Sequence, residues 1–129
     1  MTNPTRARLY LTLCCLMLVA PRVSLGADER PEVAIPYGNN PQAGRSVDVN
    51  GIDMYFETYG TGKPLLLIHG NGQSIAAMHF QIAHFAPEYQ VIVADSRGHG
   101  KSGLGTDRLV YMQMMEDYNA LLELLNVSK

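Results

Sequence analysis

A glycine-rich loop after an apolar run contains the residues that best fit a chemical role. Residues 69–72 read His-Gly-Asn-Gly and directly follow four apolar residues at 65–68. The run predicts a short buried strand over 65–69, and the glycines leave backbone amides uncovered where that strand ends. Such amides can bind the negative charge that develops on a carbonyl oxygen during acyl transfer. A tight strand-to-helix turn without a ligand would use the same residues, so the loop alone leaves both interpretations open.

A second polar loop, at residues 95–102, follows another apolar run at 90–94. It ends in Gly-His-Gly-Lys-Ser, which is also how a phosphate-binding P-loop ends. A P-loop needs glycine where this chain has Asp95, and the glycines at 103 and 105 delay the following helix. A nucleotide-binding P-loop-like module is therefore the less favoured alternative function.

A serine nucleophile would stand on a sharp G-x-S-x-G turn, and the sequence contains no such pattern. The nearest segment, residues 72–76, has alanine in place of the last glycine. Its loop also begins too early, at Gly70, for a strand-to-helix elbow. Ser74 is better explained as the cap of the helix that follows it.

Each of the four histidines is expected to have a structural or solvent-facing role. His69 belongs to a strand end and His99 to the second loop, whereas a triad base needs a nucleophile within hydrogen-bond reach. His79 and His84 are five residues apart on one expected helix, so they do not share a face as i, i+4 metal ligands would. We expect no metal site and no cofactor.

The elements that position these loops follow from the spacing of apolar and turn residues. Asn50-Gly51 predicts a two-residue hairpin turn. The order strand, helix, strand then predicts two parallel strands joined by a right-handed crossover. The expected strands are residues 46–50, 53–59, 65–69 and 90–94, and the expected helices are residues 74–85 and 107–127.

Both expected helices are amphipathic. The first places apolar residues at spacings of three and four, namely Ile75, Met78, Ile82 and Phe85. The second has a broad apolar stripe that is expected to face the core. Its members are Tyr111, Met112, Met115, Tyr118, Leu121, Leu122 and Leu125.

The two loops, in this order and at this distance, resemble the α/β-hydrolase family. The second loop fits Asp-x-Arg-Gly-x-Gly-x-Ser, residues 49–60 read Val-Asn-Gly-Ile-x-x-Tyr-Phe-Glu-Thr-Tyr-Gly, and the chain ends in a leucine-rich helix with Asp117. The resemblance covers residue 49 to the end. It implies an α/β fold, specifically the N-terminal part of the doubly wound α/β-hydrolase sheet. About four strands and two helices are expected, with the chain truncated before the nucleophile strand.

The resemblance also implies roles for residues in both loops. The backbone N–H of Asn71 is implied to be an oxyanion-hole donor. The residues implied to brace the second turn rather than touch substrate are Asp95, Arg97, Gly98 and Gly100. The remaining loop-support residues are His69, Gly70, Gly72 and Ser102.

The implied activity is hydrolysis of a small ester, lactone or related carbonyl compound through a Ser-His-Asp/Glu triad. In the family's order the nucleophile, acid and histidine would follow Lys129. We therefore expect a partial hydrolase that carries only the oxyanion-hole loop and is inactive alone. Its strand at 65–69 would then be an exposed sheet edge. A non-catalytic fragment or interaction product is the main alternative.

The first 27 residues predict a signal peptide. Arg6 and Arg8 precede an apolar segment at 9–20 that is too short to span a bilayer, and small residues near Gly26 and Ala27 suit cleavage. The expected location is periplasmic or extracellular, with no stable membrane anchor after cleavage; an uncleaved N-terminal anchor is the alternative. Both cysteines lie in the apolar segment, so cleavage would leave no thiol chemistry.

Composition limits the remaining possibilities. Residues 28–45 are rich in proline, glycine and asparagine and predict an extended leader without a core role; residues 46–129 predict the N-terminal half of a hydrolase domain. Three of the ten lysines and arginines precede residue 28 but none of the twelve acidic residues does, so the formal charge beyond residue 27 is −5. With no basic run, a nucleic-acid partner is not expected.

Overall fold

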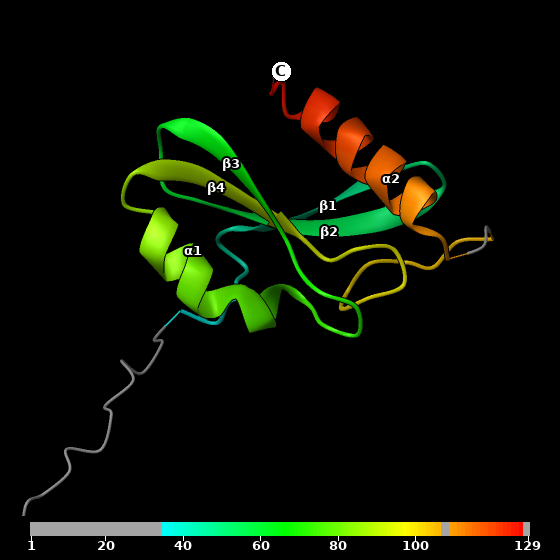
Figure 1. Ribbon diagram of the computed structural model, residues 1–129, viewed down its shortest axis with the longest axis horizontal. Coiled ribbons are helices and arrows are strands. Elements are labelled where there is room, and N and C mark those ends of the chain that lie inside the picture. Colours follow the sequence, from blue (N-terminus) through cyan, green and yellow to red (C-terminus); the bar gives the residue numbers. More distant parts are fainter. Residues whose placement is uncertain (1–34, 107–108, 128–129) are drawn as a thin grey trace, which may run out of the picture. The chain divides into compact units, whose positions relative to one another are not determined.

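The computed structural model describes residues 35–106 and 109–127, which fold as one mixed sheet with helices on both faces (Figure 1). The predicted signal peptide at 1–27 lies outside these described residues. The strands are β1 (Gly44–Val49), β2 (Ile52–Tyr59), β3 (Lys63–Ile68) and β4 (Tyr89–Ala94). The helices are the 3-10 helix η1 (Ile75–Met78), α1 (His79–Phe85) and α2 (Tyr111–Leu124).

The first two strands form the predicted hairpin. They pair antiparallel, and the pair Val49 and Ile52 closes the turn. Asn50 has φ 48° and Gly51 has φ 75°, so both turn residues adopt the left-handed conformation that a two-residue type I′ turn requires. The Asn-Gly pair was therefore a reliable signal for this hairpin.

Strands β3 and β4 pair in parallel, which confirms the prediction for these two runs. Leu66 lies opposite Ile92 and Ile68 opposite Ala94. The sheet order is β1-β2-β4-β3, so within the described residues β3 is an edge strand, as expected. Because the two strands run in the same direction, the loops that follow them emerge at the same end of the sheet. This arrangement brings the His-Gly-Asn-Gly loop beside the loop at 95–102.

Each face of the sheet is covered by one helical segment, and Figure 1 shows α1 and α2 on opposite sides. Since side chains alternate along a strand, neighbouring residues of β4 enter different cores. Ile92 packs with Tyr118 and Leu121 of α2, whereas Val91 and Val93 pack with Ile75 and Ile82 on the other face. The sheet is thus covered on both sides, as a continuous apolar strand such as β4 requires.

The prediction that residues 28–45 have no core role is wrong for the part that the structure describes. Tyr37 is only 9% exposed and packs in the core on the α1 face. The backbone N–H groups of Gly38 and Asn40 donate to the Glu57 carboxylate, and β1 begins already at Gly44. A buried carboxylate on β2 needs donors, and this segment supplies two of them.

Both helices are shorter than predicted. Residues 75–78 form a 3-10 turn before α1, and α2 begins at Tyr111; residues 107 and 108, part of the predicted second helix, are outside the described residues. The predicted apolar stripe is buried only in part. Tyr118 and Leu121 are buried, but Tyr111, Met112 and Met115 are 80%, 64% and 51% exposed. Among the described residues no helix is both long enough and apolar enough to cross a membrane.

Candidate functional site

The loop after β3 is a tight turn whose Asn71 backbone N–H makes no hydrogen bond within the described residues. Gln73 N–H donates to the Gly70 carbonyl at 3.1 Å, and the Gln73 side-chain oxygen accepts from Gly70 N–H at 3.0 Å. Gly72 has φ +70°, the conformation that the third position of a type II turn requires. Asn71 is exposed, and none of the hydrogen bonds found among the described residues uses its N–H. Among the described residues, the Asn71 amide therefore remains available to a further acceptor.

His69 joins this turn to the second loop. Its Nε2 accepts from Ser96 N–H at 2.9 Å, and its Nδ1 lies 2.8 Å from the Gly70 carbonyl. A ring nitrogen that accepts from an amide carries no proton, so Nδ1 is the protonated nitrogen and donates to Gly70. With both nitrogens engaged and only 7% of the residue exposed, His69 acts as a structural bridge.

Asp95 fixes the start of η1 and the second loop together. Its Oδ1 accepts from Ile75 N–H and its Oδ2 from Lys101 N–H, both at 2.8 Å. Ser74 occupies the N-cap position but makes no side-chain capping bond, so the predicted Ser74 cap is wrong and Asp95 supplies the acceptor. A side chain at position 100 would collide with the Asp95 carboxylate, which explains why glycine occupies this position.

Arg97 and Asp117 form a buried ion pair beneath the loop. Arg97 Nε and Nη2 each lie 2.8 Å from one oxygen of the Asp117 carboxylate, and both residues are fully buried. Nη2 also donates to the Asn50 carbonyl at 3.0 Å. Burial alone would raise the pKa of Asp117, but hydrogen bonds from Arg97, Asn50 and Gln113 outweigh it and lower that pKa. The pair anchors α2 and the β1–β2 turn to the loop.

Gly98 and Ser102 hold the second loop against the sheet. Gly98 has φ +71°, and its N–H donates to the Gly103 carbonyl at 3.0 Å. Ser102 Oγ donates to the Asp95 carbonyl at 2.6 Å and accepts from Tyr55 N–H at 2.9 Å. The loop is thereby tied to β2 as well as to η1.

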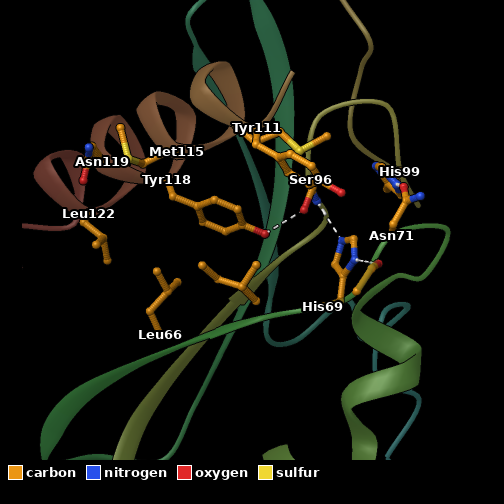
Figure 2. Close-up of a pocket in the computed structure, with 13 residues that line it drawn as sticks. Leu66, His69, Asn71, Ser96, His99, Tyr111, Met115, Tyr118, Asn119 and Leu122 are labelled. Carbon is orange, nitrogen blue, oxygen red and sulfur yellow. Dashed lines mark hydrogen bonds between the residues drawn. The ribbon is translucent and has the colours of Figure 1, made fainter. Parts of the chain in front are cut away.

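A cavity of about 320 Å³ lies between β3 and α2, beside the two loops (Figure 2). Figure 2 shows His69, Asn71 and His99 at one end and Leu66 and Leu122 at the other. The other residues that line the cavity are Ile68, Gly70, Ser96, Tyr111, Met114, Met115, Tyr118 and Asn119. No aspartate, glutamate, lysine or arginine is among them, so the cavity suits an uncharged, largely apolar molecule with one polar end. Of the predicted set, only His69, Gly70 and Asn71 line it.

Sequence reasoning missed the polar contacts that close the cavity on the α2 side. Ser96 Oγ and the Tyr118 hydroxyl lie 2.9 Å apart, and that hydroxyl donates to the Ala94 carbonyl at 3.2 Å. Burial raises the pKa of Tyr118. His99, treated only as a loop residue, places Nε2 3.4 Å from the Asn71 side-chain oxygen. No local pattern marks these pairs, because each partner comes from a different element.

The described residues offer little support for a Ser74 nucleophile, for phosphate binding or for metal binding. Ser74 is half-buried, and no serine–histidine side-chain hydrogen bond occurs in the part of the chain that the structure describes. Lys101, the lysine of the P-loop-like ending, donates to the Asn39 side chain at 2.7 Å and lies 4.4 Å from the centre of the Tyr55 ring. Across residues 35–106 and 109–127, no cluster of three or more histidines or acidic residues could hold a metal ion.

Comparison with known proteins identifies the class. Residues 63–129 match the sequence profile of the alpha/beta hydrolase fold family, so the chain belongs to this family. A curated relative, (E)-2-((N-methylformamido)methylene)succinate hydrolase of Acinetobacter baylyi, is 50% identical over 48 residues, covering 37% of this chain and 18% of the relative.

Solved structures agree with that assignment. The bromoperoxidase of Bacillus anthracis is 34% identical with a TM-score of 0.61, over 65% of this chain and 32% of its own. Est816, described as an N-acyl homoserine lactone degrading enzyme, is 32% identical with a TM-score of 0.62, over 66% of this chain and 33% of its own. The chain spans between 18% and 28% of the length of the curated relatives it matches.

Proposed function

We propose that this chain supplies the oxyanion-hole loop of a serine α/β-hydrolase that acts on a small ester, lactone or related carbonyl compound. In this proposal Asn71 N–H and the N–H that follows the nucleophile bind the carbonyl oxygen as it becomes negative. A serine nucleophile, activated by histidine and oriented by a carboxylate, completes the site. The serine, histidine and carboxylate of this triad are not assigned to any of the 129 residues. We therefore predict that the chain alone shows no turnover.

The observation that carries the proposal is the unused Asn71 amide at the polar end of the cavity. Its turn is held by Gln73 on one side, and by His69 and Asp95 through the neighbouring loop and η1. A preorganised donor of this kind costs no reorganisation when charge develops, which is what an oxyanion hole requires. The hydrolases and the lactone-degrading enzyme among the relatives support the same class of reaction.

A chimera tests the role of the amide. Residues 35–129 replace the matching segment of Est816, and hydrolysis of an ester and of an N-acyl homoserine lactone is measured. Asn71→Pro removes the N–H at the second position of the turn, where proline is favoured, so the fold should persist. We expect kcat to fall by about 10²–10³-fold.

The matched control is Asn71→Ala, which keeps the N–H and removes the side chain. It should retain most of the chimera's kcat. Equal losses in the alanine and proline variants would contradict the proposal, because they would assign the effect to the Asn71 side chain rather than to the backbone amide.

A further inference from the structure

A fully buried carboxylate on β2 has no part in the site described above. Glu57 is 0% exposed, and its two oxygens accept four hydrogen bonds. The donors are Gly38 N–H at 2.8 Å, Asn40 N–H at 3.0 Å, Tyr55 OH at 2.7 Å and Tyr59 OH at 2.8 Å. None of these four donors is a cation, because two are backbone amides and two are phenol hydroxyls.

Burial and the hydrogen bond to Glu57 raise the pKa of both Tyr55 and Tyr59, so the two phenols stay protonated donors. Burying a carboxylate is unfavourable unless its hydrogen bonds are complete. Two of the four bonds go to backbone amides at residues 38 and 40, outside the hairpin that carries Glu57. The carboxylate therefore fixes the path of that segment.

The fixed segment lies directly against η1. A Cβ atom on Gly38 would lie 3.0 Å from the backbone nitrogen of Ala76, and Gly38 has φ +82°. Only glycine allows both the close approach and this backbone conformation without strain. Residues 37–40 thus support η1 immediately after the turn that carries Asn71.

A second route links the same segment to η1 through the other loop. The Asn39 side-chain oxygen accepts from Lys101 Nζ at 2.7 Å. Lys101 N–H in turn donates to Asp95, whose other oxygen accepts from Ile75 N–H. The direct contact and the route through Asp95 converge on adjacent residues, Ile75 and Ala76.

We propose that Glu57 is a positioning residue for Asn71. By holding residues 37–40 against η1, the Glu57 carboxylate holds the end of the turn at 70–73 and so the direction of the Asn71 amide. Glu57 does not line the cavity, so it acts only through this support. The effect of Glu57 on activity rests on the proposed role of Asn71. The structural effect of Glu57 on η1 and on the turn at 70–73 does not depend on that role.

Glu57→Gln tests the link in the full chain. Glutamine keeps the size of the side chain but turns one acceptor into a donor that faces other donors. Hydrogen exchange is measured by NMR at the bonded amides of Gln73, Ile75 and Ala77, together with the chemical shift of the Asn71 amide. We expect exchange at these three amides to become about tenfold faster, a loss of about 1.4 kcal/mol of local protection, with a shifted Asn71 resonance.

Gln113→Ala is the matched control, because it removes a hydrogen bond to Asp117 on the α2 face and alanine suits a helix. It should not accelerate exchange at residues 73–77 more than elsewhere. Gly38→Ala displaces the same segment with Glu57 intact and should reproduce the Glu57→Gln pattern, which keeps the test decisive if Glu57→Gln does not fold. Uniform acceleration in both Glu57→Gln and Gly38→Ala would overturn the proposal.

The chimera separates this inference from the proposed function. If Asn71→Pro leaves kcat unchanged but Glu57→Gln still loosens residues 73–77, the positioning contact stands and the oxyanion role fails. If Asn71→Pro lowers kcat and Glu57→Gln changes neither exchange nor kcat, the reverse holds.

Discussion

The Arg97–Asp117 pair places two opposite charges in the protein interior, where both residues are fully buried. Two hydrogen bonds of 2.8 Å join the guanidinium to the carboxylate. Further bonds from Arg97 to the carbonyls of Asn50 and Leu104 use more of its donors. Each charge is therefore compensated by the other at hydrogen-bonding distance.

Removing one partner should leave an uncompensated charge in the core. We expect Arg97→Ala to lower the free energy of unfolding by about 3–5 kcal/mol, measured by urea denaturation. Lys101→Ala, which removes an exposed ammonium from the same loop, should cost about 1 kcal/mol or less. Comparable losses of unfolding free energy in the two variants would show that the buried pair contributes no more to stability than an exposed charge.

The lowered pKa of Asp117 makes stability depend on acidity in a defined direction. An aspartate in an unfolded chain titrates near pH ~3.9, above the value in the folded protein. Between the two values the unfolded state binds the extra proton, so stability falls as the pH drops through this range and is complete above about pH 5. Urea midpoints between pH 6 and pH 3 should show this fall in the native chain.

Asp117→Asn removes the titrating group and should flatten that dependence relative to the native chain, although it lowers stability at pH 6. Asp48→Asn, on the exposed outer strand, provides the comparison. A pH profile of Asp117→Asn as steep as that of the native chain would assign the acid sensitivity to other groups.

At the scale of elements, β3 has an unusual position. It contributes Leu65, Leu66 and Leu67 to the sheet, yet within the described residues it pairs only with β4. Its edge has one charge, Lys63, followed by Pro64, and no charge from residue 65 to residue 73. Ile68 at the strand's end is 55% exposed. Such an uncharged edge is open to pairing with another chain.

We expect the 129-residue chain to self-associate through this edge. Ile68→Lys should shift sedimentation toward the monomer with less than about 1 kcal/mol of lost stability, because the residue is largely exposed. Met112→Lys adds the same charge at a position 64% exposed on α2, away from the edge, and should leave association unchanged. An equal effect of both variants would attribute association to net charge.

Elements were predicted well where the signal is local. The Asn-Gly turn, the two apolar strands and their parallel direction all depend on short runs of residues, and the structure contains them. Element ends were predicted less well, and for η1 the reason is that a distant group supplies the acceptor at its start. Ser74 has the right residue type for a cap, but Asp95, from the next strand's loop, takes that role.

At the scale of the whole molecule, the same distinction separates what the sequence reveals of the site. The glycines and polar residues of both loops are contiguous, so their motifs could be recognised. Glu57 could not be singled out, because two of its partners lie 17 and 19 residues earlier in a segment that looked like a leader. The Ser96–Tyr118 contact likewise joins residues 22 apart, on a loop and a helix.

The Tyr118 side chain has one more consequence. The chain contains no tryptophan, so tyrosines dominate its near-ultraviolet signal. Tyr118 is 5% exposed, and its hydroxyl is bonded to the strand and loop beneath α2. The difference between the near-ultraviolet signals of Tyr118→Phe and the native chain would therefore report whether α2 is packed against the sheet. This measurement needs no added label.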